Sequence, residues 1–254
     1  MKWMIFLLWG CLLTGSSWAA SPVIEVYADL YPPFIILQGG QLSGPYIDAF
    51  TQLAKEQGID VHYQAMPVRR LMKRLAVQPN SCGLAVNFAP GEAETIRYIG
   101  RVAPITLAVY ARAGTVGKMV NLEQLRQYRV GAIDVAELNE LLDNAAIRYE
   151  PLAKAGNGIA MLQANRFDLL VSDVLPELLM AKSERVTIER VMVLARVERW
   201  LACHPELSPA TLNGLRKALP VGVFADSVQG IWSRYGLLPV YDQVRREWGT
   251  PAPH

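Results

Sequence analysis

RFDLLVSDVLPEL, residues 166–178, decides the fold, because a short apolar run ends on an acid, Asp173, just before a helical pattern begins. The run is too short for a buried helix and fits a buried strand of a parallel sheet. In open parallel sheets, ligands bind beyond the carboxyl ends of the strands. We therefore expect Asp173 to emerge at an edge where a ligand can sit. Asp173 also suits the N-cap of the next helix, and the two roles are compatible.

The same alternation of strands and helices extends through the chain on both sides of this stretch. Strands are predicted at 23–29, 61–66, 82–88, 105–113, 128–133, 147–152, 167–172, 191–196 and 198–204. Helices are predicted at 44–58, 68–77, 135–145, 158–166 and 175–183, and residues 208–248 are mostly helical. Strands that alternate with helices of this length indicate an α/β fold with mostly parallel sheets.

Residues 1–19 are predicted to be a secretory signal peptide. An apolar run, Met4–Leu13, leads to small residues at Ser17 and Ala19, where signal peptidase reads the chain. An alternative, lipidation of Cys11, conflicts with the apolar run that continues past it. No later apolar stretch has the roughly 18 residues that a membrane span needs. The mature chain is therefore expected in the periplasm.

Composition excludes several classes of function. The formal net charge is +2 and no Lys/Arg run exceeds two residues, which argues against a nucleic-acid partner. Three scattered His residues and the absence of CxxC argue against a metal site. No GxSxG, HExxH or P-loop motif is present, so we expect neither an enzyme nor a cofactor. In an exported chain, Cys82 and Cys203 are either a disulfide or two buried thiols.

Several short motifs, taken in order, resemble one family. They are Tyr31-Pro32-Pro33-Phe34, Gly44-Pro45-Tyr46-Ile47-Asp48, Pro67 with Arg70, and Arg166-Phe167-Asp168 leading to Asp173. Together they are similar to the small periplasmic solute-binding proteins of ABC importers, and more narrowly to the bacterial family 3 type, many of which bind amino acids. The resemblance covers about residues 22–236.

The resemblance implies two Rossmann-like lobes with mostly parallel sheets, joined by two crossover strands near 105–113 and 195–205. Residues 20–108 plus 201–254 are expected to form the first lobe, and residues 109–200 the second. A ligand lies between the lobes, which close on it by hinge motion. The protein is expected to act as a monomer.

The resemblance also implies roles for individual residues. The acid matching Asp173 receives the ligand's ammonium group, and an aromatic matching Phe34 packs against the ligand. Phe34 and its neighbour Tyr31 could instead be core residues beneath a proline-stiffened loop. Arg70 stands where relatives place an arginine facing the cleft, although its helix also reads as a solvated basic face.

Three further residues stand at the ends of predicted strands. Asn87 and Phe88 end the third strand and would offer an amide and backbone groups to a polar ligand. Asp134 opens a helix whose N-terminus faces the cleft in the family, although it could simply cap that helix. An acid at a helix N-terminus would repel an anionic ligand.

One segment departs from the family. Where relatives have Thr-Pro-Glu-Arg, whose arginine holds the ligand carboxylate in two parallel hydrogen bonds, this chain has Ala89-Pro90-Gly91-Glu92. Glu92 stands near the place of the missing arginine. Arg70, Arg97 and Arg101 are the candidate substitutes, and their spacing does not choose among them.

The expected function is therefore capture of a small polar solute, an amino acid or a related compound, for delivery to an ABC importer. Two alternatives remain. One is a signalling or accessory receptor that feeds no transporter. The other is a dehydratase-like enzyme in which Glu92 acts as a general acid or base.

Overall fold

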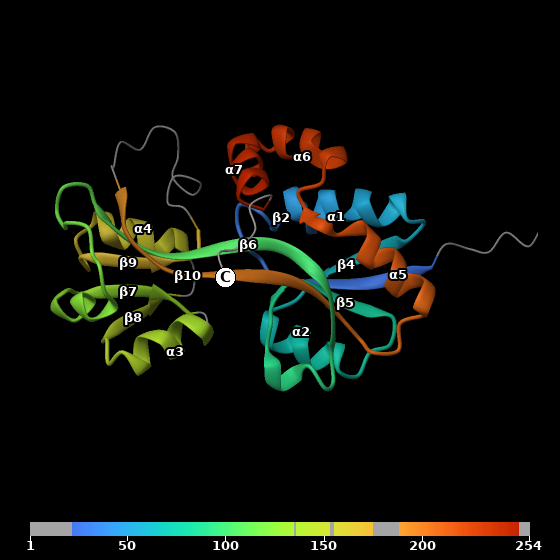
Figure 1. Cartoon of the computed structure of the whole chain (residues 1–254), viewed down its shortest axis with the longest axis horizontal. Coiled ribbons are helices and arrows are strands. Elements are labelled where there is room, and N and C mark those ends of the chain that lie inside the picture. Colours follow the sequence, from blue (N-terminus) through green and yellow to red (C-terminus); the bar gives the residue numbers. More distant parts are fainter. Residues whose placement is uncertain (1–21, 135, 153–154, 175–187, 249–254) are drawn as a thin grey trace, which may run out of the picture.

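A computed structural model of the chain describes residues 22–134, 136–152, 155–174 and 188–248. The predicted signal peptide and the predicted helix at 175–183 lie outside these residues. Two lobes share one eight-stranded sheet, and two long strands run from one lobe to the other (Figure 1). The strand order is β4 (Asp60–Ala65), β1 (Val23–Ala28), β5 (Ser81–Asn87), β10 (Ile188–Cys203), β6 (Arg97–Arg112), β9 (Leu169–Ser172), β7 (Val130–Ile133) and β8 (Tyr149–Leu152).

Strand direction confirms the predicted α/β fold with two lobes. β1 is parallel to β4 and β5, and β7 is parallel to β8 and β9. The crossover strands β6 and β10 are antiparallel to each other and to their neighbours β9 and β5. Each crossover has 16 residues, which extend roughly 50 Å and can therefore serve both lobes.

One detail of the predicted crossovers was wrong. The separate strands expected at 191–196 and 198–204 are one strand, β10, whose pairing with β6 shifts register without a turn. The polar residues in the middle of β10 look like a break between two strands in the sequence. They occur within one strand because its middle, which passes between the lobes, is only partly buried. The lobe boundaries expected at 108 and 200 fall inside β6 and β10, so they stay a prediction.

The first lobe carries helices on both faces of the sheet (Figure 1). On one face lie α1 (Pro45–Glu56), α5 (Pro209–Ala218), α6 (Gln229–Arg234) and α7 (Leu238–Trp248), and on the other lies α2 (Val68–Leu75). α1 buries Tyr46, Phe50 and Leu53 at helical spacing. Fully buried Trp232 stacks on Phe224 with 4.5 Å between ring centroids, so α6 is anchored in the same core.

The second lobe places α3 (Ala136–Asn144) and α4 (Ala155–Gln163) on opposite faces of its sheet (Figure 1). All four residues of β9 are buried, as the apolar run in the sequence predicts. Asp168, just before β9, binds Arg129 through two side-chain hydrogen bonds of 2.7 and 3.2 Å. This pair fastens the start of β9 beside β7, so Asp168 has a structural role.

Several small elements were not predicted. β2 (Ile36–Gln38) and β3 (Gln41–Ser43) form a hairpin, and β11 (Pro220–Val223) interrupts the helical C-terminal region. The hairpin turn is Gly39-Gly40, and both residues have positive φ, as a two-residue turn of this kind requires. The 3-10 helices are η1 (Pro90–Glu92), η2 (Leu122–Gln127) and η4 (Asp226–Val228).

Cys82 of β5 and Cys203 of β10 face each other in adjacent strands and form a disulfide. Within the described ranges, no helix has the length and apolar character needed to cross a bilayer. The same residues contain no cluster of three or more His, Cys, Asp or Glu side chains suited to a metal ion.

Candidate functional site

An aromatic loop follows β1 and forms one wall of the candidate site. Tyr31 and Ile35 exchange backbone hydrogen bonds of 2.9 Å, which fold residues 31–35 into a compact turn. The turn stacks Phe34 on Tyr46 at the start of α1, with 4.9 Å between ring centroids, and places the Tyr31 ring 5.4 Å from Phe34. The loop therefore holds its rings through contacts with the core.

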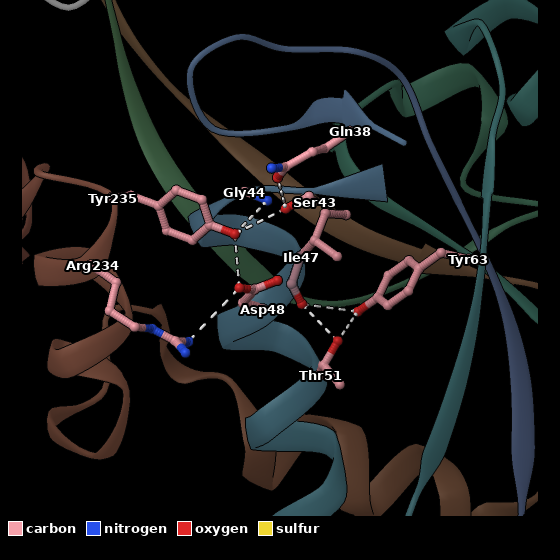
Figure 2. A network of polar contacts seen from close by, with 9 residues as sticks. All are labelled: Gln38, Ser43, Gly44, Ile47, Asp48, Thr51, Tyr63, Arg234 and Tyr235. Carbon is pink, nitrogen blue, oxygen red and sulfur yellow. Dashed lines mark hydrogen bonds and ion pairs between the residues drawn. The ribbon is translucent and has the colours of Figure 1, made fainter. Parts of the chain in front are cut away.

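A polar network fastens the start of α1, just after the aromatic loop, to Arg234 and Tyr235 at the end of α6 (Figure 2). The Tyr235 hydroxyl accepts a 3.1 Å hydrogen bond from the Gly44 backbone N–H and donates one of 2.8 Å to Asp48 Oδ2. Gly44 has φ 117°, and a Cβ there would lie 2.4 Å from the Phe34 carbonyl oxygen. Only glycine fits this close approach, so the network and Gly44 together fix Phe34 beside α1.

Asp173 lies just after β9, opposite the aromatic loop, and joins two parts of the molecule. Its Oδ2 accepts a 3.2 Å hydrogen bond from the Arg199 guanidinium of β10. Its backbone carbonyl accepts a 3.4 Å hydrogen bond from the Tyr31 hydroxyl. The Arg199 guanidinium also lies over the Tyr31 ring, 5.5 Å from its centroid. Tyr31 of the first lobe is thereby connected to Asp173 of the second.

The ion pair is largely withdrawn from water, since the Asp173 side chain is 5% exposed and that of Arg199 is 13% exposed. Burial raises the pKa of the Asp173 carboxyl above its usual range, and the nearby Arg199 charge opposes that rise. Burial, and then the charge of Asp173, raise the pKa of Tyr31 well above its usual value. The Tyr31 hydroxyl is therefore protonated at neutral pH and available as a donor.

A pocket lies where the two lobes, the crossover strands and α7 meet. Its volume is about 90 Å³, which holds several water molecules but is below the roughly 300 Å³ of small-molecule sites. A larger guest therefore needs the walls to separate. The lining residues are Tyr31, Phe34, Tyr46, Pro104, Ile105, Thr106, Asp173, Val174, Arg190, Phe224, Val240, Gln243, Val244 and Glu247.

The structure thus brings three predicted residues, Tyr31, Phe34 and Asp173, to one pocket. Phe34 is also a core residue with 6% exposure, so the core position expected for it is confirmed, and its contact with a ligand stays a prediction. Asn87 is not in the lining, but it is the β5 residue paired with Arg199. Side chains of directly paired residues project from the same face of a sheet, so Asn87 lies beside Arg199.

The other predicted residues lie elsewhere. Phe88 is 47% exposed and contacts the rings of Tyr98 and Trp200, at 4.7 and 5.9 Å between centroids. Trp200 follows Arg199 in β10, and successive strand residues point to opposite faces. The Phe88 group therefore belongs to the face that carries α2, away from Asp173.

The charged candidates also lie outside the pocket lining. Arg70 of α2 and Arg97 are exposed, and Asp134 is exposed and accepts a 2.7 Å hydrogen bond from Asn139. Glu92 lies in η1, and its buried Oε2 has no hydrogen-bond partner among the described residues. Arg101 pairs with Glu198 near the surface at 2.8 Å.

Sequence reasoning missed Arg199, Tyr46 and the contribution of α7. Arg199 is the arginine that meets Asp173, yet the substitutes considered were elsewhere. One signal was available: Arg199 alternates with the apolar Leu201 and Cys203, so its side chain is expected on their buried face. A charged residue on a buried face needs a partner, and Asp173 supplies it.

Solved structures with similar architecture were identified. One is a histidine kinase sensor domain with similarity to periplasmic binding proteins (TM-score 0.66, 17% identity, 91% of this chain and 97% of that chain). Another is an ancestral arginine-binding protein bound to arginine (0.62, 16%, 91% and 100%). A third is the GluR0 ligand-binding core in complex with L-glutamate (0.69, 12%, 85% and 99%).

At these identities the likeness establishes the fold. The chain has the type II periplasmic binding protein fold, as its motifs imply. No protein-family model matches the sequence, and no curated protein matches it. The neighbours are binding proteins and receptor domains.

Proposed function

We propose that the protein binds a small polar solute between its two lobes, in the periplasm, and closes on it by a hinge motion of β6 and β10. One observation carries the proposal. Tyr31 of the first lobe and Asp173 of the second line the same pocket and touch each other. A solute that contacts both residues favours the closed arrangement of the lobes by its differential affinity for that arrangement.

Delivery of the solute to an ABC importer is the favoured outcome of binding. The motifs that resemble the solute-binding proteins of ABC importers support this role, and a monomer suffices for it. In this proposal the protein holds its ligand unchanged and needs no cofactor. Glu92 as a general acid or base is disfavoured, because it does not line the pocket that contains Asp173.

A second role, a ligand-binding receptor for signalling, is supported by the likeness to a histidine kinase sensor domain. The two roles differ in the partner of the closed form. Affinity purification of the tagged protein from solubilised membranes, with ligand present, separates them. Recovery of an importer's membrane subunits favours delivery, whereas recovery of a kinase or another receptor favours signalling.

Binding itself is tested by a thermal-shift screen over amino acids, carboxylates, amines and small peptides. We expect at least one compound to raise the melting temperature of the protein, and Tyr31→Ala to lose that rise. Tyr149→Ala is the matched control, because Tyr149 lies in β8 and not in the pocket lining. Equal ligand responses in both variants would remove Tyr31 from the site.

A further inference from the structure

The negative charge of Asp173 is already balanced by a positive side chain of the protein itself. Its carboxylate is 5% exposed and already holds the Arg199 guanidinium at 3.2 Å. A ligand ammonium that took Arg199's place would leave a guanidinium with 13% exposure and no counter-charge. Breaking a buried pair in this way is strongly unfavourable. The resemblance implies that Asp173 binds the ligand's ammonium group, but the Arg199 guanidinium already occupies that place.

Arg199, in contrast, has N–H donors that no described residue accepts from. A guanidinium has five N–H donors, and the contacts of Arg199 with described residues use one donor and one face, toward Asp173 and the Tyr31 ring. These two contacts hold the planar group in a fixed orientation, which suits two parallel hydrogen bonds to a carboxylate. Asn87, paired with Arg199 across the sheet, adds an amide on the same face.

The aromatic loop favours the same arrangement. The Tyr31 hydroxyl donates to the Asp173 carbonyl and its ring lies against Arg199, so two residues of the pocket lining contact the guanidinium. Arg199 lies just outside the lining, which contains Arg190, but it contacts two lining residues, Asp173 and Tyr31. Arg70, Arg97 and Arg101 neither line the pocket nor pair with either of these residues. Of the four, Arg199 is therefore the one placed to replace the arginine that is missing at residues 89–92.

We infer that Arg199 is the anchor for the ligand's carboxylate, that Asp173 positions Arg199, and that the ligand class is small carboxylates in which an α-ammonium group is not required. This inference rests on the proposed function. A carboxylate adds to the donors of Arg199 that no described residue occupies, without displacing Asp173. An α-ammonium group finds Asp173 already paired and gains little there.

Matched ligand pairs test the inference on the unaltered protein. Each amino acid is compared by calorimetry with the acid that carries hydrogen in place of its α-ammonium group, for example L-glutamate with glutarate and L-alanine with propionate. The corresponding amines without a carboxylate complete each set. We expect at least one acid to bind as tightly as its amino acid or more tightly, and its amine to bind at least roughly tenfold more weakly.

Two results separate the inference from the proposed function. If amino acids bind and the loss of the ammonium group weakens binding tenfold or more, the function holds and the inference is overturned. If no acid, amino acid or amine binds, both the inference and the proposed binding of small polar solutes of these classes are overturned.

Variants then test whether Arg199 is the residue that binds the ligand's carboxylate. Arg199→Gln should weaken binding of the acid at least roughly tenfold, Arg199→Lys should fall between it and the unaltered protein, and Arg101→Gln should match the unaltered protein. Asp173→Asn keeps the shape of the pocket but removes the charge that positions Arg199, so it should weaken binding of the acid, though less than Arg199→Gln does. Retention of acid binding in Arg199→Gln, or a larger loss in Asp173→Asn than in Arg199→Gln, would contradict the assigned roles.

Discussion

Removal of Arg199 should destabilise the protein far more than removal of another paired arginine. In Arg199→Ala, the Asp173 carboxylate would remain 5% exposed with no counter-charge. Loss of one partner of a buried pair costs about 3–5 kcal/mol, and we expect about 3 kcal/mol because Asp173 can take up a proton. For a chain of this size, that free energy lowers the melting temperature by roughly 6–12 °C.

Arg101→Ala is the matched control, because Arg101 also pairs with a carboxylate, that of Glu198, at 2.8 Å. Both members of that pair are more than a third exposed, so the expected cost is only about 0.2–1 kcal/mol. Urea denaturation at pH 7 measures both variants, and a double variant with Asp173→Asn should recover part of the loss caused by Arg199→Ala. Equal destabilisation by Arg199→Ala and Arg101→Ala would refute the buried-pair reasoning.

Two further predictions concern other contacts. Hydrogen bonds from Arg129 lower the pKa of Asp168 below its usual value, so the pair stabilises the fold above the ordinary carboxyl pKa of about 4 and loses that effect as pH falls through the lowered value. Thermal melts should therefore show Asp168→Asn destabilised at pH 7 and closer to the unaltered protein at about pH 3, and equal losses at both pH values would contradict this. The disulfide closes a loop with a sequence separation of 121, so Cys82→Ala with Cys203→Ala should cost roughly 4–5 kcal/mol in urea denaturation, and a loss below about 1 kcal/mol would argue against the link.

The alternation of apolar strands and amphipathic helices was sufficient to predict the α/β architecture. Residues 169–171 show why, since a strand with helices on both faces of its sheet must be apolar on both sides. Asp173 was placed correctly at the end of that strand because polar residues cannot continue into a buried run without a partner. An apolar strand and the polar residue that ends it are neighbours in the sequence, so both can be predicted from it.

The composition of the site was harder to predict, because it depends on contacts between distant segments. Arg199 meets Asp173 only through the register of β10 against its neighbours. The α7 residues reach the pocket from the far end of the chain. Phe88 and Glu92 were expected near Asp173, yet they follow β5 in a segment that packs on the α2 side. The alternation of side chains along β10 would have shown that the face that carries α2 and the face that carries Asp173 are opposite faces of the sheet.

The central claim, that the lobes close around a captured solute, is tested most directly by small-angle X-ray scattering with and without a saturating ligand from the thermal-shift screen. We predict a smaller radius of gyration in the presence of ligand, and no such change in Tyr31→Ala. An unchanged radius of gyration in the unaltered protein, when calorimetry shows the site to be fully occupied, would contradict closure of the lobes.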